Sequence, residues 1–266
     1  MASTLERYGY RGEDVREVAR VVSSHGDYYH LVCNEAEGEL IARKKKSCFL
    51  NDETKPVTGD FVRFAHNPSG ESFITYVLPR FSVFERRDPS ARRKSQMLAV
   101  NFDALFIMTG LDGDFSLPRL KRYLQLASGI GKAEAVVVLT KCDIADPPAE
   151  AATLGCRTIA ISSVTGKGLD EVREFVMPGR TVAMVGSSGV GKSTLLNALA
   201  GEEWAATRET QSWSGRGRHT TTSRELVMLP DGSMVVDTPG IREIGIVGER
   251  DVQLAKGTST HRFRMK

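Results

Sequence analysis

Short apolar runs separated by turn residues follow one another along the first third of the chain. Turn signals rich in Gly, Asp, Asn and Pro lie at 25–27 and 67–70. Five runs have the length and the β-branched or aromatic content of strands, at 17–22, 28–33, 39–43, 60–64 and 72–77. Short strands without a long helix predict a small barrel over residues 1–80, and the OB-fold is the commonest such barrel.

Beyond residue 104 the pattern changes to strands that alternate with helical segments. Continuous apolar runs typical of parallel strands covered on both faces lie at 104–109, 135–139, 158–161 and 181–185. Leucines 117, 120 and 124 share a helical face, and we expect Ser116 to cap that helix. A hairpin is predicted at 226–229 and 234–236. The alternation predicts a doubly wound α/β domain over residues 81–248, with a tail at 249–266.

The run at 181–185 leads into a glycine-rich loop that a helical segment follows. The loop is Gly186-Ser187-Ser188-Gly189-Val190-Gly191-Lys192-Ser193-Thr194. A GxxxxGKS pattern between a strand and a helix is typical of a P-loop, whose N–H groups point at nucleotide phosphates. We expect Lys192 to reach the terminal phosphates and Ser193 to bind Mg²⁺. The sequence therefore predicts a nucleoside triphosphate site.

Two further strand ends favour guanine over adenine. Thr140-Lys141-Cys142-Asp143 follows the second parallel strand. Asp143 can accept hydrogen bonds from N1–H and the exocyclic amine of guanine, whereas adenine offers an acceptor at N1 and leaves the carboxylate unpaired. The aliphatic stem of Lys141 can cover one face of the base. Ser162 and Ser163 begin a loop that can present backbone N–H groups to the guanine carbonyl. These residues predict GTP and GDP as ligands.

A fourth strand end predicts the γ-phosphate sensor. In Asp237-Thr238-Pro239-Gly240, we expect Asp237 to orient a water on Mg²⁺ and the Gly240 N–H to meet the γ-phosphate. The base motif and the serine loop precede the P-loop here, whereas in ordinary GTPases they follow it. The domain is therefore predicted to be circularly permuted, with an unchanged sheet, because only the connections differ.

Two short sequence motifs, one on each side of the last predicted hairpin, add to a resemblance between this chain and a known family. The permuted order, the N-terminal barrel, Gly-Arg-His-Thr-Thr-Thr at 217–222 and Asp-Thr-Pro-Gly-Ile-Arg-Glu at 237–243 resemble the RsgA/YjeQ family over residues 15–248. The resemblance implies an OB-fold, a permuted GTPase domain, and a GTPase activity that is low alone and stimulated by the small ribosomal subunit. It also implies a role in the late maturation of that subunit.

The chain departs from this family's pattern in two ways. Thr140 stands where many GTPases carry Asn, and it keeps a hydroxyl but loses the amide. The family also has a C-terminal zinc-binding domain with cysteines and a histidine. Since no cysteine follows Cys156, we expect no zinc in this chain.

The hydrolytic residue has to be found outside the usual position. Many GTPases place Gln directly after Asp-x-x-Gly to orient the attacking water, but Ile241 stands there and cannot do so. His219 is our catalytic candidate, and the resemblance points to the same residue; the alternative is a loop histidine without a catalytic part. Among the neighbouring threonines, we expect Thr221 to bind Mg²⁺.

Charge and composition leave an RNA partner open. A net charge of +3 and a pI of about 8.7 permit nucleic acid without demanding it. A basic patch after the third strand can contact RNA phosphates or simply be a solvated strand edge, and it consists of Arg43, Lys44, Lys45 and Lys46. A basic connector at 80–94, with prolines at 79 and 89, is expected to be extended or turning. The cysteines have no metal-binding spacing, which predicts reduced thiols.

The function predicted from these features is a GTPase that hydrolyses GTP to GDP while bound to the small ribosomal subunit and its rRNA. A different class of function, a GTP-gated rRNA-binding module with incidental hydrolysis, stays open. No apolar stretch is long enough to cross a bilayer, and the N-terminus lacks an apolar signal core. We therefore expect a cytoplasmic monomer without a membrane partner.

Overall fold

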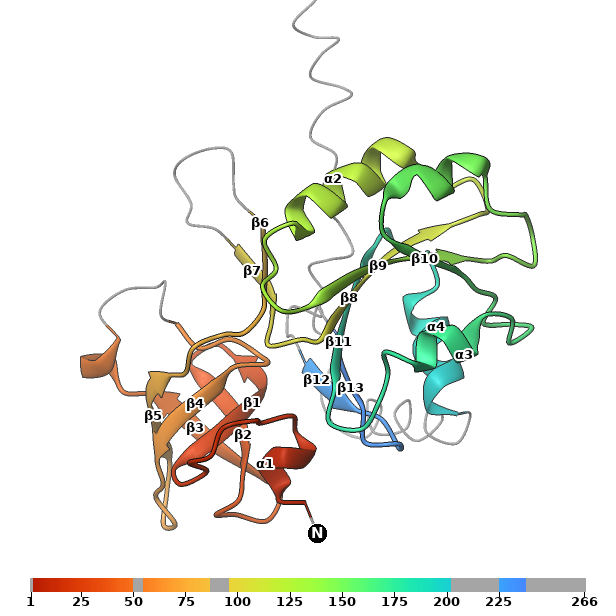
Figure 1. The fold of residues 1–266 in the computed structure, drawn as a ribbon. Coiled ribbons are helices and arrows are strands. Elements are labelled where there is room, and N and C mark those ends of the chain that lie inside the picture. Colours follow the sequence, from red (N-terminus) through yellow and green to blue (C-terminus); the bar gives the residue numbers. More distant parts are fainter. Residues whose placement is uncertain (1, 50–54, 87–95, 202–224, 238–266) are drawn as a thin grey trace, which may run out of the picture.

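The computed structural model describes residues 2–49, 55–86, 96–201 and 225–237. These residues form a small barrel and a larger domain in which helices cover both faces of a sheet (Figure 1). Within the described residues, eleven strands are joined edge to edge across both parts, and a separate pair forms a hairpin.

The barrel is closed by five strands. They are β1 (Val18–His25), β2 (Tyr28–Cys33), β3 (Glu39–Lys44), β4 (Phe61–Ala65) and β5 (Ser72–Val77). Neighbouring strands follow the order β1-β2-β3-β5-β4, and β4 pairs back onto β1. β3 and β5 run parallel, while the other pairs are antiparallel. This confirms the barrel and the five strands expected from the sequence.

Alternation along the strands gives the barrel its own core. Buried residues such as Val21, Leu31, Val62 and Ile74 meet inside it. A short helix that the sequence pattern did not predict, α1 (Thr4–Arg7), precedes the barrel. Ser3 and Glu6 form a capping box at the N-terminus of the helix, and the buried Leu5 packs it against the barrel.

The larger domain contains six strands in one sheet. They are β8 (Ala104–Gly110), β9 (Glu134–Thr140), β10 (Arg157–Ala160), β11 (Thr181–Gly186), β12 (Glu225–Met228) and β13 (Met234–Asp237). Their spatial order is β10-β9-β8-β11-β13-β12. All pairs are parallel except β12 with β13. After β8, the chain adds β9 and then β10 on one side of β8. It then returns and places β11 on the other side of β8, so the strand order reverses between β8 and β11.

Helices cover both faces of this sheet (Figure 1). On one face, Leu105 and Ile107 of β8 belong to the same buried cluster as residues of α2 (Leu117–Ala127) and η3 (Ala149–Leu154). On the other, Phe106 and Met108 belong to a cluster with residues of α3 (Leu169–Arg173) and α4 (Lys192–Ala200). Successive side chains of one strand therefore enter opposite cores, as the continuous apolar runs predicted. Ser116 occupies the N-cap position of α2, as expected, and its carbonyl accepts a 3.0 Å hydrogen bond from the N–H of Leu120, but its side chain makes no capping hydrogen bond.

The connector between the two parts contains a strand that the sequence pattern did not predict. Its described residues include β6 (Val83–Arg86), which pairs with β7 (Gln96–Val100) in an antiparallel hairpin. Phe84 is buried in the core beneath α2. Arg80, the first residue of the connector, is held against the barrel, because its guanidinium makes two 2.7 Å hydrogen bonds to the fully buried carboxylate of Asp60.

The barrel and the larger domain meet along β1 and β12. These strands pair at Ser23 and Glu225. Buried residues of both parts form one apolar cluster, which includes Val22 and Val32 of the barrel and Leu226, Met234 and Val236 of the sheet. The outer face of β1 is thus covered by the second domain, so the two parts share a packed interface.

Arg20 of β1 crosses this interface and is 1% exposed. Its Nη2 donates to the carbonyl of Asn101, at 3.0 Å, and to the hydroxyl of Thr181, at 2.9 Å. Its Nη1 donates to the carbonyl of Tyr8, and the guanidinium lies 4.8 Å from the ring centroid of Phe61. Burial lowers the pKa of Arg20 to about 10. A charged side chain of the barrel is therefore held by acceptors from three segments, of which Thr181 is the first residue of β11.

Candidate nucleotide-binding site

The predicted nucleotide-binding residues that the structure describes lie at one edge of the sheet. Because β8, β9, β10, β11 and β13 are parallel, their carboxyl ends meet there. In open α/β sheets, ligands bind outside these ends where the strand order reverses. That point lies between β8 and β11, and the P-loop sequence follows β11 directly.

The P-loop encloses a hollow at the start of α4. The strand residues before it are buried, and Gly189 and Gly191 have φ values of +75° and +102°, which L side chains rarely adopt. A cavity of about 270 Å³ is lined by Ser188, Gly189, Gly191, Lys192, Ser193 and Thr194. The hollow lies at a helix N-terminus, where backbone N–H groups and the helix dipole favour an anion.

Lys192 supplies the positive charge of this hollow. Its Nζ donates hydrogen bonds of 2.7 Å to the carbonyl oxygens of Gly186 and Ser187. The ammonium is thereby folded back over the loop, beside the cavity. Ser193, the next residue, is exposed at the first turn of α4. An ammonium, an exposed hydroxyl and a glycine loop together fit the phosphates of a nucleotide.

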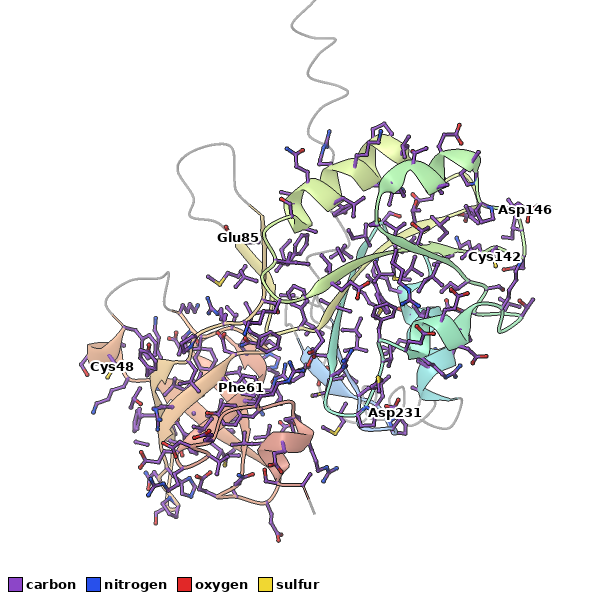
Figure 2. All side chains as sticks on the ribbon, viewed as in Figure 1. Cys48, Phe61, Glu85, Cys142, Asp146 and Asp231 are labelled. Atoms are coloured by element: carbon purple, nitrogen blue, oxygen red, sulfur yellow. The ribbon has the colours of Figure 1, made fainter. Side chains whose placement is uncertain are left out.

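The base motif begins at the end of β9. Thr140 is buried, and Lys141 has a φ of +64°, which turns the chain sharply. Nζ of Lys141 is paired with the carboxylate of Asp112, and this hydrogen bond lowers the pKa of Asp112. Asp143 is exposed and open to a ligand, whereas Cys142 between them is buried. Figure 2 shows Cys142 and Asp146 at the edge of the domain that lies away from the barrel.

The serine loop closes on itself beside this motif. The buried hydroxyl of Ser162 accepts hydrogen bonds from the N–H groups of Val164, at 3.3 Å, and Thr165, at 3.2 Å. The Cys142 N–H donates to the carbonyl of Ile161, at 3.0 Å, which fixes the two loops next to each other. Ser163 is half-buried. The hydroxyl of Ser162 thus shapes the loop, and the expectation that backbone N–H groups of this loop meet the guanine carbonyl stays a prediction.

The loop after β8 holds a residue that sequence reasoning missed. Oδ2 of Asp114 accepts a 2.6 Å hydrogen bond from the hydroxyl of Ser187 in the P-loop. Its other oxygen lies 2.9 Å from Nη2 of Arg119 in α2. The only sequence signal was a pair of aspartates directly after a predicted parallel strand. The contact fixes the first turn of the P-loop from the neighbouring strand.

Several predicted residues cannot be placed. His219, Thr221 and Gly240 lie outside the described residues, and of Asp237 only the backbone, at the end of β13, is described. β13 ends at the same edge as β11, because the two strands are parallel neighbours. The roles of these four residues stay predictions.

The basic patch of the barrel lies on β3 and η1 (Lys46–Cys48), far along the strand order from the P-loop. The guanidinium of Arg43 is stacked 4.2 Å from the ring centroid of Tyr28, and its Nε lies 3.2 Å from the carboxylate of Glu71. Lys44 is half-buried, while Lys45 and Lys46 are exposed. The two exposed lysines are therefore the more accessible part of the patch.

The described part of the chain shows neither a metal-binding cluster nor a membrane-spanning helix. Among these residues, His, Cys, Asp and Glu side chains do not gather in groups of three that could hold a metal ion. Within the same ranges, no helix has the length and apolar character needed to span a membrane. The four cysteines are free thiols.

The fold and this edge define a P-loop nucleotide-binding protein in which an OB-fold barrel precedes a GTPase domain with a permuted order of sequence motifs. The family model of the RsgA GTPase matches residues 77–247. The chain belongs to the RsgA GTPase family, which confirms the predicted family and the predicted class of activity.

Individual relatives agree with this assignment. The "Small ribosomal subunit biogenesis GTPase RsgA 2" of Lactiplantibacillus plantarum is 38% identical over 241 residues, which cover 88% of this chain and 68% of that protein. The crystal structure of YjeQ from Thermotoga maritima has a TM-score of 0.61 at 24% identity, covering 84% of this chain and 74% of that one. A structure of YloQ, described as a circularly permuted GTPase, has a TM-score of 0.55 at 19% identity, covering 89% and 76%. The two structures support the fold, and the permuted fold class is confirmed.

Proposed function

We propose that this chain binds GTP at the edge of its sheet, hydrolyses it to GDP, and acts on the small ribosomal subunit during late maturation. The observation that carries the proposal is the placement of a P-loop and a Lys-x-Asp motif at nearby ends of a permuted parallel sheet. The names of the curated relatives support the ribosomal partner. The site of action would be the cytoplasm, and a monomer would suffice.

In this proposal the phosphates lie in the hollow at the start of α4. The N–H groups of the loop and the ammonium of Lys192 would bind them, because the loop residues and Lys192 line the cavity at a helix N-terminus. Ser193, Asp237 and Thr221 would hold Mg²⁺. The ion, when bound, supplies positive charge that stabilises the charge developing on the phosphates. His219 would orient the attacking water, since Ile241 cannot.

The guanine base would lie between the motif at the end of β9 and the serine loop. The exposed carboxylate of Asp143 would accept two hydrogen bonds from guanine, while Lys141, held by Asp112, would cover one face of the ring. This arrangement favours GTP over ATP because adenine would leave the carboxylate unpaired.

The barrel would contact rRNA through Lys45 and Lys46. Both lysines are exposed, and phosphate contacts of this kind position a protein without reading a sequence. Each phosphate contact also contributes to the salt dependence of binding. Replacing both lysines with alanine should therefore weaken binding to the subunit and make it less dependent on salt.

The test is GTP turnover by the full chain with and without purified bacterial small ribosomal subunits, with ATP as the control nucleotide. We expect slow turnover alone and strong stimulation by the subunit, with GTP only. Completing a GTPase site in trans is worth about 10³–10⁵ in rate. Equal turnover of ATP would contradict the proposed site. Intact GTP binding without stimulation would contradict the proposed partner.

A histidine variant separates turnover from nucleotide-gated binding. We expect His219→Ala to abolish stimulated turnover while nucleotide-dependent binding to the subunit remains. If release from the subunit after GTP addition is unchanged in this variant, hydrolysis is incidental, and the protein is a GTP-gated binding module.

A further inference from the structure

The hydroxyl of Thr140 lies where the end of β9 contacts the P-loop. Thr140 is the last residue of β9 and is 3% exposed. Its Oγ1 lies 2.6 Å from the carbonyl oxygen of Val190 and 3.4 Å from that of Thr109. Because a hydroxyl carries a single proton, the shorter contact takes it. Thr140 therefore donates its hydrogen bond to the P-loop.

The rest of the Thr140 side chain packs on the same loop. A Cβ atom placed on Gly191 would lie 3.8 Å from Cβ of Thr140, so the side chain of Thr140 faces Gly191 as well as Val190, with room for about a methyl group between it and the glycine. The chain then turns at Lys141, whose φ is +64°. Beyond this turn Asp143 is exposed to the ligand side. The turn separates a residue that serves the loop from residues that can meet the base.

We propose that Thr140 is a positioning residue for the P-loop and makes no hydrogen bond to the nucleotide base. Many GTPases carry Asn at this place, and an amide has two protons to donate, whereas a hydroxyl has one. In this chain that proton is committed to the Val190 carbonyl. The choice of base would then depend on Asp143. The affinity for the phosphates would depend on the hydrogen bond between the Thr140 hydroxyl and the Val190 carbonyl. The inference rests on the proposed nucleotide site.

Removing the hydroxyl would leave the carbonyl of Val190 without this donor in a buried position. The loop would then populate other arrangements, and the apparent affinity for nucleotide falls with the population of the binding arrangement. A buried hydrogen bond of this kind corresponds to an affinity loss of about ten-fold. The loss should be the same for every base, because the effect acts through the phosphates.

The experiment measures dissociation constants by calorimetry for wild type, Thr140→Val and Thr140→Ser. The ligands are GDP, 7-deaza-GDP, which lacks the ring acceptor N7, and 6-thio-GDP, in which a poor acceptor replaces O6. Thr158→Val, on the neighbouring strand β10, is the matched control, because its hydroxyl bonds to the carbonyl of Cys156 at 3.4 Å and not to the P-loop. Thermal unfolding without nucleotide reports whether each variant folds.

We expect Thr140→Val to weaken all three ligands by the same factor, about ten-fold, while Thr140→Ser and Thr158→Val stay within about two-fold of wild type. If Thr140→Val weakens GDP but spares either analogue, Thr140 is a base ligand and the inference is wrong. If Thr140→Val binds all three ligands like wild type, the hydrogen bond from Thr140 to Val190 has no role in nucleotide binding, and the inference is also wrong. If Thr140→Val does not fold, comparing Thr140→Ala with Thr140→Ser gives the same distinction. Failure of the wild-type protein to bind GDP would instead overturn the proposed function.

Discussion

The carboxylate of Asp143 is the side chain on which the choice of nucleotide depends. It is exposed after the turn at Lys141, and the described structure leaves it open to a ligand. A carboxylate only accepts hydrogen bonds, so it matches the N1–H and the exocyclic amine of guanine. A site built around such a pair rejects a base that cannot form it, since the polar group would be left unpaired.

Asp143→Asn should therefore change the preferred base from guanine to xanthine. The amide keeps an acceptor for N1–H but turns its NH₂ toward position 2, where xanthine carries a carbonyl oxygen and guanine a second donor. We expect GDP affinity to fall by at least about 100-fold and XDP to become the tighter ligand. Asp146→Asn, an exposed aspartate in the same loop, is the control and should leave both affinities unchanged. Similar behaviour of the two variants would show that Asp143 does not contact the base.

The sequence identified the side chains that face the ligand better than those that support them. The P-loop, Lys141 and Asp143 belong to short local patterns, so they could be read directly. Their partners could not: Asp112 is 29 residues away from Lys141, and Asp114 is 73 residues away from Ser187. Such contacts depend on which strands become neighbours in the sheet. The sequence order of a permuted domain does not reveal that directly.

Two glycines of the serine loop, alike in backbone conformation, should respond differently to the same substitution. Gly166 and Gly168 have φ values of +81° and +72°. A Cβ on Gly166 would meet nothing within 4 Å, whereas one on Gly168 would lie 2.2 Å from the carbonyl oxygen of Ala160 at the end of β10. We expect Gly166→Ala to cost about 1 kcal/mol of unfolding free energy, from the left-handed backbone alone. Gly168→Ala should cost at least about 3 kcal/mol, because backbone has to move.

Urea unfolding of the two variants measures this difference. Gly166→Ala is the matched control, since both changes add one methyl group to a left-handed glycine. GDP affinity provides a second readout, because the shifted backbone lies beside the predicted base site. Equal losses of stability would mean that the loop relaxes freely at Gly168, and that β10 does not hold it.

Elements with a strong local pattern were predicted well, and those that depend on tertiary contacts were not. The strands of the barrel and of the sheet have continuous or alternating apolar residues, and the structure confirms them. The hairpin of β6 and β7 was missed, because the chain between its strands reads as a basic connector with prolines. Helix α1 has four residues, too few for a periodic signal, and its burial against the barrel stabilises it.

Arg20 is the clearest case of a role that only the complete chain reveals. In the sequence it occupies the middle of an apolar strand, where an arginine on the outer face is expected to be solvated. The structure covers that face with β12 and β13, so the guanidinium becomes fully buried. The position links the barrel to the strand that leads into the P-loop, since Thr181 is the first residue of β11.

Arg20→Lys should therefore uncouple the two parts of the chain. Lysine carries its three donors on a single nitrogen, so it cannot contact Tyr8, Asn101 and Thr181 from the two separate positions that the guanidinium nitrogens occupy. We expect a loss of about 3 kcal/mol in unfolding free energy, because buried acceptors lose their donor. Arg63→Lys is the control, since its 3.0 Å ion pair with Asp14 is partly exposed and should contribute less than about 1 kcal/mol.

Hydrogen exchange with and without GDP shows whether the parts unfold together. In the wild type, GDP should raise the protection of amides in β4 as well as in β9, because a ligand stabilises every segment that opens with its site. In Arg20→Lys, GDP should still protect β9, but protection of β4 should no longer respond. A response of β4 that persists in this variant would mean that the apolar cluster around Met234 joins the barrel to the sheet without the arginine. A response absent already in the wild type would mean that the barrel unfolds independently of the nucleotide site.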